Sequence, residues 1–245
     1  MIGVEDMQFV GVDGCKKGWF AVALDSGQNW AINAYKSIDE LWQAMNSASM
    51  MFIDIPIGLP DSGRRACDLE TRNLLGRRGA SVFAVPSRKA LQSKNYRQAC
   101  RLNQDVLGVK LSIQTWNITA KIKEIDNWLQ RNRQAQSIVR ESHPELCFWA
   151  LAGEHIMGHS KKTAQGFAER CSILQKQYSR TEAIVKQALN QFRRKDLARD
   201  DILDALVLAV SARFSAGKPK TVPLTPPVDE KGRPMEIVYP PGRFI

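Results

Sequence analysis

Residues 200–210 read DDILDALVLAV, and this stretch decides the fold. Apart from its three aspartates every side chain is apolar, and a helix without a polar face is typical of a protein core. Asp200 suits the N-cap, where an acidic side chain is also stabilised by the helix dipole. Asp204 lies a turn further in, three residues after Asp201, so these carboxylates share a face and repel each other. A buried carboxylate without a partner costs several kcal/mol, so we expect a basic side chain or a metal ion to neutralise Asp204.

The N-terminal part of the chain predicts a β-sheet. Segments rich in β-branched and aromatic residues are separated by short turns, which predicts three antiparallel strands at 8–14, 19–25 and 29–35. A helix is expected at 38–48, because Ser37 and Glu40 form a capping box. The run MMFIDIPIG at 50–58 is apolar apart from its aspartate, as central strands of parallel sheets are.

The rest of the chain predicts one α/β domain over residues 1–245. We expect a mostly helical insertion at about 60–136, with one helix at 112–129, and an extended proline-rich tail at about 217–245 with one short edge strand at 236–239. Between them we expect a strand at 137–142, then helices at 144–153, 163–191 and from residue 200. The order β-β-β-α-β-α-β-α around a mixed sheet is the outline of an RNase H-like domain.

Two aspartates follow the strands that this outline places side by side. Asp13 lies near the end of the first strand and Asp54 near the end of the fourth, and parallel neighbours are about 5 Å apart. Each aspartate alone suits a turn. Together with Asp201 and Asp204 they form an acidic cluster from three elements, whose carboxylates repel one another unless a cation lies between them. Oxygen ligands suit Mg²⁺ or Mn²⁺ rather than zinc, so we predict a metal site at Asp13, Asp54, Asp201 and Asp204.

Composition indicates an ordinary globular protein. The chain has 245 residues, of which 44% are hydrophobic, so it has enough apolar material for a substantial core. No apolar run approaches about 20 residues, and the N-terminus MIGVEDMQFV lacks the pattern of a signal peptide, so we expect a cytoplasmic protein without a membrane segment. The five cysteines are scattered and include no CxxC pair, which favours reduced thiols over disulfides or zinc.

The positive charge of the chain is concentrated in one segment. The formal net charge is +10, and residues 61–140 hold 16 Lys and Arg against 6 Asp and Glu. Arginines and backbone amides of a glycine-rich loop suit phosphate, so we predict a nucleic acid, RNA or DNA, as the partner. The alternative for part of the set is a helical ion pair such as Asp68 with Arg72. The candidate substrate-binding residues are Arg64, Arg65, Arg72, Arg77, Arg78, Ser81, Arg88, Lys161 and Lys162.

Several runs of sequence resemble the motifs of domain-of-unknown-function family 429, which are predicted RNase H-like nucleases. They occur in order across nearly the whole chain: GVDGCKKGWF (11–20), FIDIPIGLPDSGRRACDLETR (52–72), GASVFAVPSR (79–88), ESHPELCFWALAG (141–153), KKTAQGFAER (161–170) and RDDILDALVLA (199–209). The last run is also similar to the final helix of RuvC-type resolvases, whose acidic pair would fall on Asp201 and Asp204. The resemblance implies an RNase H-like fold and a nuclease activity.

A nuclease of this kind is expected to use two metal ions about 3.5 to 4 Å apart. In that scheme Asp13 bridges the ions, Asp54 binds one of them, and Asp204 with Asp201 binds the other. Glu141 or Glu145 is a further candidate ligand, although Glu145 also suits a first-turn acid of its helix. His143 either caps that helix or transfers a proton.

Two other functions remain open at this point. A non-catalytic nucleic-acid-binding protein of the same fold is the first. The second is a phosphoryl-transfer enzyme of the sugar kinase and ATPase type, because GVDGCKKGW is similar to the phosphate-binding hairpin of those proteins. The sequence leaves open the choice of RNA, DNA or a branched substrate, endo or exo cleavage, and the oligomeric state.

Overall fold

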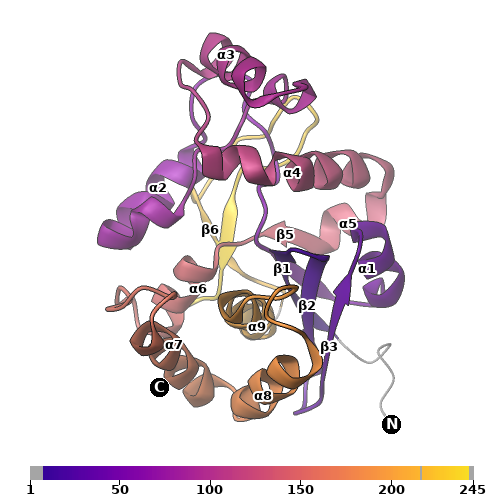
Figure 1. The fold of residues 1–245 in the computed structure, drawn as a ribbon, viewed down its shortest axis with the longest axis vertical. Coiled ribbons are helices and arrows are strands. Elements are labelled where there is room, and N and C mark those ends of the chain that lie inside the picture. The colour runs from indigo at the N-terminus through magenta and orange to yellow at the C-terminus, as the bar shows by residue number, and fades with distance from the viewer. Residues whose placement is uncertain (1–7, 216, 243–245) are drawn as a thin grey trace.

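The protein is an α/β structure in which helices cover both faces of one mixed sheet (Figure 1). The computed structural model describes residues 8–215 and 217–242. Residues 1–7 lie outside the described residues. They belong to the N-terminal stretch in which no signal peptide is expected. Within the described ranges no helix has the length and apolar character needed to cross a membrane.

The central sheet has the strand order β3-β2-β1-β4-β5. β1 and β3 both pair antiparallel with β2, while β4 is parallel to β1 and β5 is parallel to β4. The predicted mixed α/β architecture is therefore confirmed, including three antiparallel strands followed by a strand parallel to the first. The strands are β1 (Phe9–Cys15), β2 (Gly18–Leu24), β3 (Trp30–Tyr35), β4 (Met50–Ile53) and β5 (Val139–Glu141). β4 ends earlier than expected because Pro56 has no N–H for a ladder hydrogen bond.

The alternating directions of the side chains along each strand divide the hydrophobic core into two layers, one on each face of the sheet. Successive side chains of a strand point to opposite faces, so Phe20 and Val22 of β2 pack on one side of the sheet and Ala21 and Ala23 on the other. The first layer is closed by α6 (Pro144–Leu151), α7 (Ala164–Gln177), α8 (Thr181–Gln191) and α9 (Arg199–Ser215). The second is closed by α1 (Ile38–Met45), α4 (Ile113–Arg131) and α5 (Arg133–Ile138).

Helix α9 lies directly on the central strand β1. Its side chains from Ile202 to Ala212 are buried, as the apolar sequence predicts. A Cβ atom added to Gly11 of β1 would lie 2.1 Å from the carbonyl oxygen of Ala205 and 2.2 Å from the amide nitrogen of Ala209. The backbones of strand and helix are therefore in contact, and the glycine fixes the distance between the aspartates of α9 and those of the sheet.

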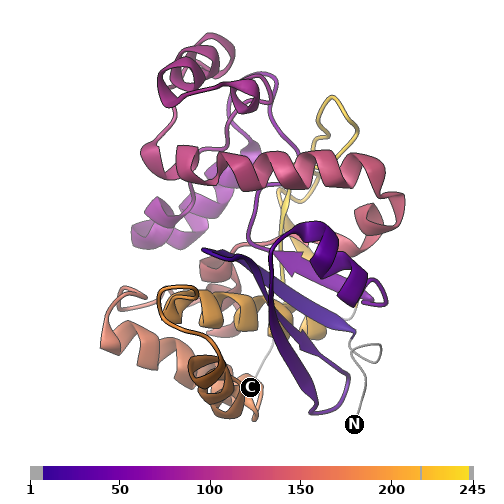
Figure 2. The ribbon, with the colours of Figure 1, turned by 45° about the vertical axis from the view of Figure 1, so that its right-hand side comes forward.

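The predicted insertion is helical, and its last helix belongs to the core. It contains α2 (Ala66–Leu75), two 3₁₀ segments, η2 (Gly76–Ser81) and η3 (Ala90–Gln92), and α3 (Tyr96–Leu107). α4 follows and packs on α1, with the rings of Trp42 and Trp128 5.5 Å apart. In both views α3 lies at the opposite end of the molecule from α8 (Figures 1 and 2).

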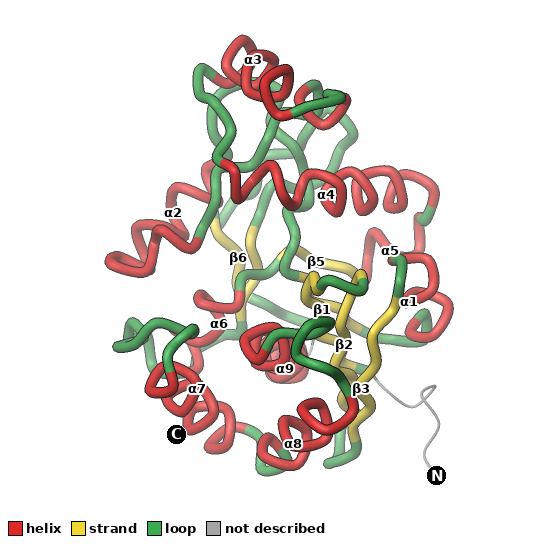
Figure 3. The backbone as a smooth tube through the Cα atoms, in the orientation of Figure 1, coloured by secondary structure: helices red, strands yellow, loops and turns green. Residues whose placement is uncertain are grey.

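Two predicted elements differ from the structure. The helical stretch expected at about 163–191 is divided into two helices, because the chain turns at 178–180, where the hydroxyl of Thr181 donates to the carbonyl of Tyr178 at 2.7 Å. No glycine or proline marks this break in the sequence. The tail strand exists as β7 (Ile237–Tyr239), but it pairs with an unexpected strand, β6 (Lys220–Val222), in a separate two-stranded sheet next to β5 (Figure 3).

Candidate functional site

A pocket of about 440 Å³ opens at the carboxyl ends of β1 and β4. This end of the parallel strands is where α/β sheets place their ligands. Asp13 and Asp54 line the pocket on the sheet side, and residues 80–83 after α2, the start of α6, the loop before α7 and one face of α4 complete it. The pocket therefore joins the sheet to the segment that carries the excess of positive charge.

Asp13 and Asp54 point toward the face of the sheet that α9 covers. Gly11 of β1 and Phe52 of β4 face this helix, and the side chains two residues further along a strand point the same way. The amide of Asp54 donates to the carbonyl of Val12 at 2.9 Å, which aligns the two strand ends. Burial, together with the charges of Asp54, Asp204 and Asp201, raises the pKa of Asp13 well above its ordinary value. Burial also raises the pKa of Asp54 to about 6, although Lys161 opposes the shift.

Helix α9 brings the other two predicted ligands to the same place. The expected N-cap is wrong, because the helix begins at Arg199, and it is Asp201 that caps by accepting a hydrogen bond from the amide of Ala198 at 2.9 Å. Burial raises the pKa of Asp201 and of Asp204 to about 6. Neither Asp201 nor Asp204 is among the residues that line the pocket, but the charge of Asp201 raises the pKa of both Asp13 and Asp54. The structure therefore gathers the four predicted aspartates into one acidic cluster.

Lys161 is the basic partner of this cluster. Its ammonium donates to Oδ2 of Asp204 and lies 3.9 Å from a carboxylate oxygen of Asp200. Burial alone would lower the pKa of Lys161, but Asp204 and Asp13 outweigh it and raise the pKa above its ordinary value. Lys161, predicted to bind substrate, therefore contacts the protein's own carboxylate and remains charged at neutral pH.

The chemistry of the acidic cluster fits a divalent cation, with one rearrangement. Hard carboxylate oxygens are the donors that Mg²⁺ and Mn²⁺ prefer. Oδ1 of Asp204 is buried and has no hydrogen-bond partner among the described residues, while Oδ2 accepts from Lys161. In the part of the chain that the structure describes, no group of three or more His, Cys, Asp or Glu side chains is arranged to hold a metal ion as it stands. Oδ1 of Asp204 is thus open to a cation, and a cation that used both carboxylate oxygens would displace Lys161.

Glu141 belongs to a different set of contacts from the one predicted. Its two carboxylate oxygens accept from the guanidinium of Arg65, at 2.7 Å each, and one of them also accepts from the amide of Ile57 at 2.6 Å. Arg65 also pairs with Asp68 at 2.5 Å, so Asp68 does not use Arg72. Arg65 and Glu141 are 2% and 6% exposed. Both side chains also line the pocket, but each is satisfied by the other, and this pairing favours a structural role over the predicted contacts with metal and substrate.

Glu145 is held in a similar way. It lies in the first turn of α6, as the alternative prediction has it, and Arg170 of α7 donates to its Oε1 at 2.5 Å. Both side chains are buried. Glu145 lines the pocket, as Glu141 does, and its charge raises the pKa of Asp54 and Asp204. Glu145 is thus the glutamate whose charge acts on the acidic cluster.

The remaining basic candidates divide into two groups. Arg77, Arg78 and Lys162 line the pocket together with Ser81, and among the described side chains none of these three cations forms an ion pair. Arg78 is positioned by a 3.1 Å hydrogen bond from its Nε to the carbonyl of Met157. Arg64 and Arg72 do not line this pocket and lie instead around a smaller neighbouring one.

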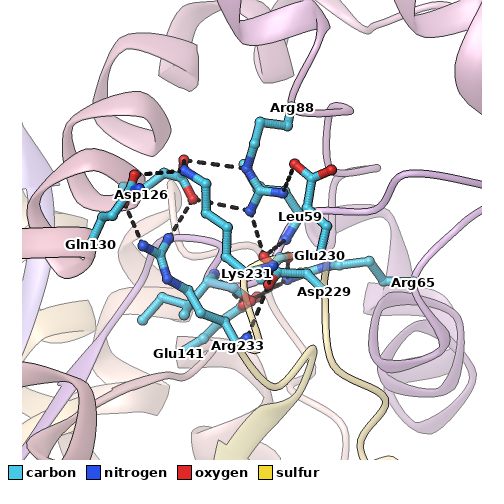
Figure 4. A network of polar contacts seen from close by, with 12 residues as sticks. Leu59, Arg65, Arg88, Asp126, Gln130, Glu141, Asp229, Glu230, Lys231 and Arg233 are labelled. Carbon is cyan, nitrogen blue, oxygen red and sulfur yellow. Dashed lines mark hydrogen bonds and ion pairs between the residues drawn. The ribbon is translucent and has the colours of Figure 1, made fainter. Parts of the chain in front are cut away.

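Arg88, also predicted to bind substrate, lies in an ion-pair network (Figure 4). Its guanidinium contacts Asp229 at 2.5 Å, Glu230 at 2.7 Å and Asp126 of α4 at 3.2 Å. Asp126 also pairs with Lys231 and Arg233, so this network attaches the C-terminal tail to α4. Arg88 does not line the pocket, and its ion pairs favour a structural role over the predicted contact with substrate.

The sequence patterns do not reveal Lys121. Lys121 of α4 lines the pocket, donates to the carbonyl of Gly18 and lies 4.4 Å from the ring centre of Trp19. Nothing in the spacing of α4 marks this lysine, because only the fold brings it to the strand ends.

His143 is the N-cap residue of α6, but its side chain makes no capping bond, and its buried Nδ1 has no hydrogen-bond partner among the described residues. Burial lowers the pKa of His143, so the ring is neutral at pH 7.

Replacing Asp204 by asparagine is expected to stabilise the metal-free protein by about 1–3 kcal/mol at about pH 7.5. The pKa of Asp204 is raised from 3.8 to about 6 in the folded protein, so the folded state binds a proton more tightly than the unfolded state. Stability from this group is therefore present at low pH and is lost as the pH rises from about 4 to about 6, since a tenfold difference in proton affinity corresponds to about 1.4 kcal/mol. Urea unfolding in a chelator at about pH 4.5 and 7.5 measures the effect, which should be clearly smaller at the lower pH. An equal change in stability at both pH values would contradict this electrostatic account.

Comparison with known proteins identifies a family and nothing more specific. No curated protein and no solved structure shows a significant match to the chain. A family model described as "Protein of unknown function (DUF429)" matches residues 11–228, which include the four aspartates of the acidic cluster and the basic residues of the pocket. Since this match covers most of the chain, the protein belongs to family DUF429, as its sequence motifs predict.

Proposed function

We propose that this protein is a metal-dependent nuclease that hydrolyses phosphodiester bonds of RNA or DNA. The observation that carries the proposal is the pocket at the ends of β1 and β4, where an acidic cluster meets arginines that have no ion-pair partner among the described residues. The charges of Asp54, Asp204 and Asp201 raise the pKa of Asp13, and Lys161 offsets them only in part. Carboxylates in a cleft that shift one another's pKa values are common at catalytic sites. The nearby cations suit the phosphate backbone of a nucleic acid.

We further propose that the fold is RNase H-like. Three antiparallel strands, a fourth strand parallel to the first and a final helix across the centre of the sheet support this topology. So do the positions of the acidic residues, which lie at the ends of β1 and β4 and in the first turns of α9. A shared fold alone would not define the activity, so the proposal of a nuclease depends on the side chains of the pocket.

Each group in the pocket has a separate task in the proposed reaction. Asp13, Asp54 and Asp204 would hold Mg²⁺ or Mn²⁺, with Asp201 adding negative charge behind them. The bound cation would stabilise the charge that develops on the phosphate oxygens during hydrolysis. Arg77, Arg78 and Lys162 would bind the phosphates on either side, and neutral His143 can accept a proton. Lys161 neutralises Asp204 in the metal-free protein and would be free to contact phosphate if a bound cation took its place.

The contact between Lys161 and Asp204 also supports a second candidate, a non-catalytic nucleic-acid-binding protein. In that case the lysine is the permanent partner of the carboxylate, and the arginines of the pocket still bind phosphate. The two candidates differ in whether a divalent cation enters the acidic cluster and whether the bound strand is cut.

Cleavage assays on the wild-type protein test the proposed function. End-labelled RNA, DNA and hybrid substrates are incubated with Mg²⁺, with Mn²⁺ and with a chelator. We expect shortened products with either metal and none with the chelator. Binding of the same substrates without cleavage in any metal would exclude the nuclease and favour the non-catalytic candidate.

A further inference from the structure

The pocket has an apolar wall that hydrolysis of a phosphate does not require. Beside the acidic cluster it is lined by Ile55, Val82, Phe83, Val85 and Ile118. Phe83 is the one aromatic ring other than that of His143 among the described residues of the lining, and it is 42% exposed. An exposed phenylalanine at the wall of a charged pocket is suited to a flat, partly apolar ligand, because a base stacks on an aromatic face whatever its sequence.

The volume of the pocket supports a ligand larger than a phosphate. About 440 Å³ lies in the range of roughly 300–1,000 Å³ in which proteins bind small organic molecules. Three cations, Arg77, Arg78 and Lys162, line the same space and can hold the phosphate of such a ligand. The apolar wall and the aromatic ring suit the sugar and base of a nucleotide, and the three cations suit its phosphate.

The depth of the acidic cluster argues against an intact duplex. Asp13 is 8% exposed and Asp204 is 2% exposed, and α4 lines the pocket on one side while residues 160–162 line it on the other. A phosphate within a duplex is attached to paired and stacked neighbours and cannot enter a pocket of this kind alone. Enzymes that act on a nucleotide in a pocket take single strands or move the nucleotide out of the stack.

We propose that the pocket receives one unstacked nucleotide, from a single-stranded end or an unpaired position, whose base stacks on Phe83 while its phosphate faces the acidic cluster. The inference rests on the proposed nuclease function and names its substrate class. Arg77, Arg78 and Lys162 bind the phosphates of the entering strand, and the apolar wall holds the sugar and base.

Two sets of measurements test this substrate class. Fluorescence anisotropy on the Asp13→Asn protein, in which cleavage does not interfere, compares a labelled single strand, a blunt hairpin duplex and a nucleoside monophosphate competitor. Cleavage by the wild type in Mn²⁺ compares the single strand, the blunt duplex and a duplex with a single-stranded overhang. We expect the single strand and the overhang to be preferred over the blunt duplex by at least about tenfold in both assays.

Substitutions of Phe83 separate stacking from packing. Phe83→Ala should weaken binding of the single strand by about tenfold, Phe83→Leu should weaken it similarly because it lacks a ring face, and Phe83→Trp should retain it. Leu224→Ala is the matched control, since Leu224 is 89% exposed and does not line the pocket. Thermal unfolding of every variant verifies that the fold is retained.

The outcomes distinguish this inference from the proposed function. Equal cleavage of blunt duplex and single strand would overturn the inference and leave the nuclease in place. Phe83-dependent binding of single strands and of the nucleoside monophosphate, with no cleavage in any metal, would support the pocket assignment and overturn the nuclease. Binding that is the same in Phe83→Ala, Phe83→Leu and wild type would overturn the assignment of the base to Phe83.

Discussion

Asparagine in place of Asp13 is expected to lower the rate of metal-dependent cleavage by about 10³-fold or more. Asp13 lies at the centre of the acidic cluster, where the charges of Asp54, Asp204 and Asp201 all act on it. A bound cation lowers the activation free energy of phosphodiester hydrolysis by several kcal/mol, and each 1.36 kcal/mol corresponds to about a tenfold change in rate. Removing one charged ligand from the cluster should forfeit most of that stabilisation. Single-turnover cleavage of a labelled strand in Mn²⁺ measures the change.

A control for this variant needs the same chemical change away from the pocket. Asp105 of α3 is exposed and forms no ion pair within the described residues, so Asp105→Asn should cleave at the wild-type rate. Asp13→Asn should also fold at least as stably as the wild type, because the raised pKa of Asp13 shows that its ionised form is unfavourable there. A variant that is folded and cuts at an undiminished rate would remove Asp13 from the reaction.

Methionine in place of Arg65 is expected to lower the free energy of unfolding by about 3–5 kcal/mol. Arg65 is 2% exposed and is the shared partner of Glu141 and Asp68, so the substitution leaves two carboxylates buried without a cation. The hydrogen bonds that Arg65 donates to the carbonyls of Ile57 and Gly58 are lost as well. Urea unfolding followed by fluorescence or circular dichroism gives the difference directly.

The neighbouring arginine supplies the matched control. Arg64 is exposed and forms no ion pair in the residues that the structure describes, so Arg64→Ala should change stability by less than about 0.5 kcal/mol. If Arg65→Met were as stable as the wild type and lost only affinity for nucleic acid, the sequence-based prediction of a substrate-binding Arg65 would be correct and the structural role wrong.

The sequence predicts the part of the fold that depends on local patterns. Segments rich in β-branched and aromatic residues, separated by short turns, predict β1 to β3, and the apolar run at 50–53 predicts the parallel strand β4. The absence of a polar face predicts that helix α9 is buried. The break between α7 and α8 was not predictable, because it is fixed by packing of Tyr178 and by a bond from Thr181 rather than by a glycine or proline. The partner of β7 was also missed, since three residues of strand at 220–222 carry too little periodicity.

The same distinction holds for the candidate site. Asp13 and Asp54 could be placed together from sequence because parallel neighbours end side by side, and α9 had to bring its aspartates to the sheet. The partner of Asp204 could not be predicted from the sequence, because Lys161 lies 43 residues earlier in a loop without periodicity. The pairing of Arg65 with Glu141 could not be predicted either, because the two residues are 76 positions apart and only the fold buries them together. Charge alone indicates a basic segment, and only the fold separates the arginines that form buried ion pairs, such as Arg65, from those in the pocket without an ion pair among the described residues, such as Arg77 and Arg78.

Calorimetric titration of Mn²⁺ into the metal-free wild-type protein tests the central claim most directly. The claim is that the acidic cluster of Asp13, Asp54, Asp201 and Asp204 is a divalent-cation site that Lys161 neutralises in the absence of metal. We predict saturable binding that is lost in Asp13→Asn and in Asp204→Asn while both variants remain folded. Absence of Mn²⁺ binding by the wild type, with and without a single-stranded oligonucleotide, would contradict the account and leave Lys161 as the permanent partner of Asp204.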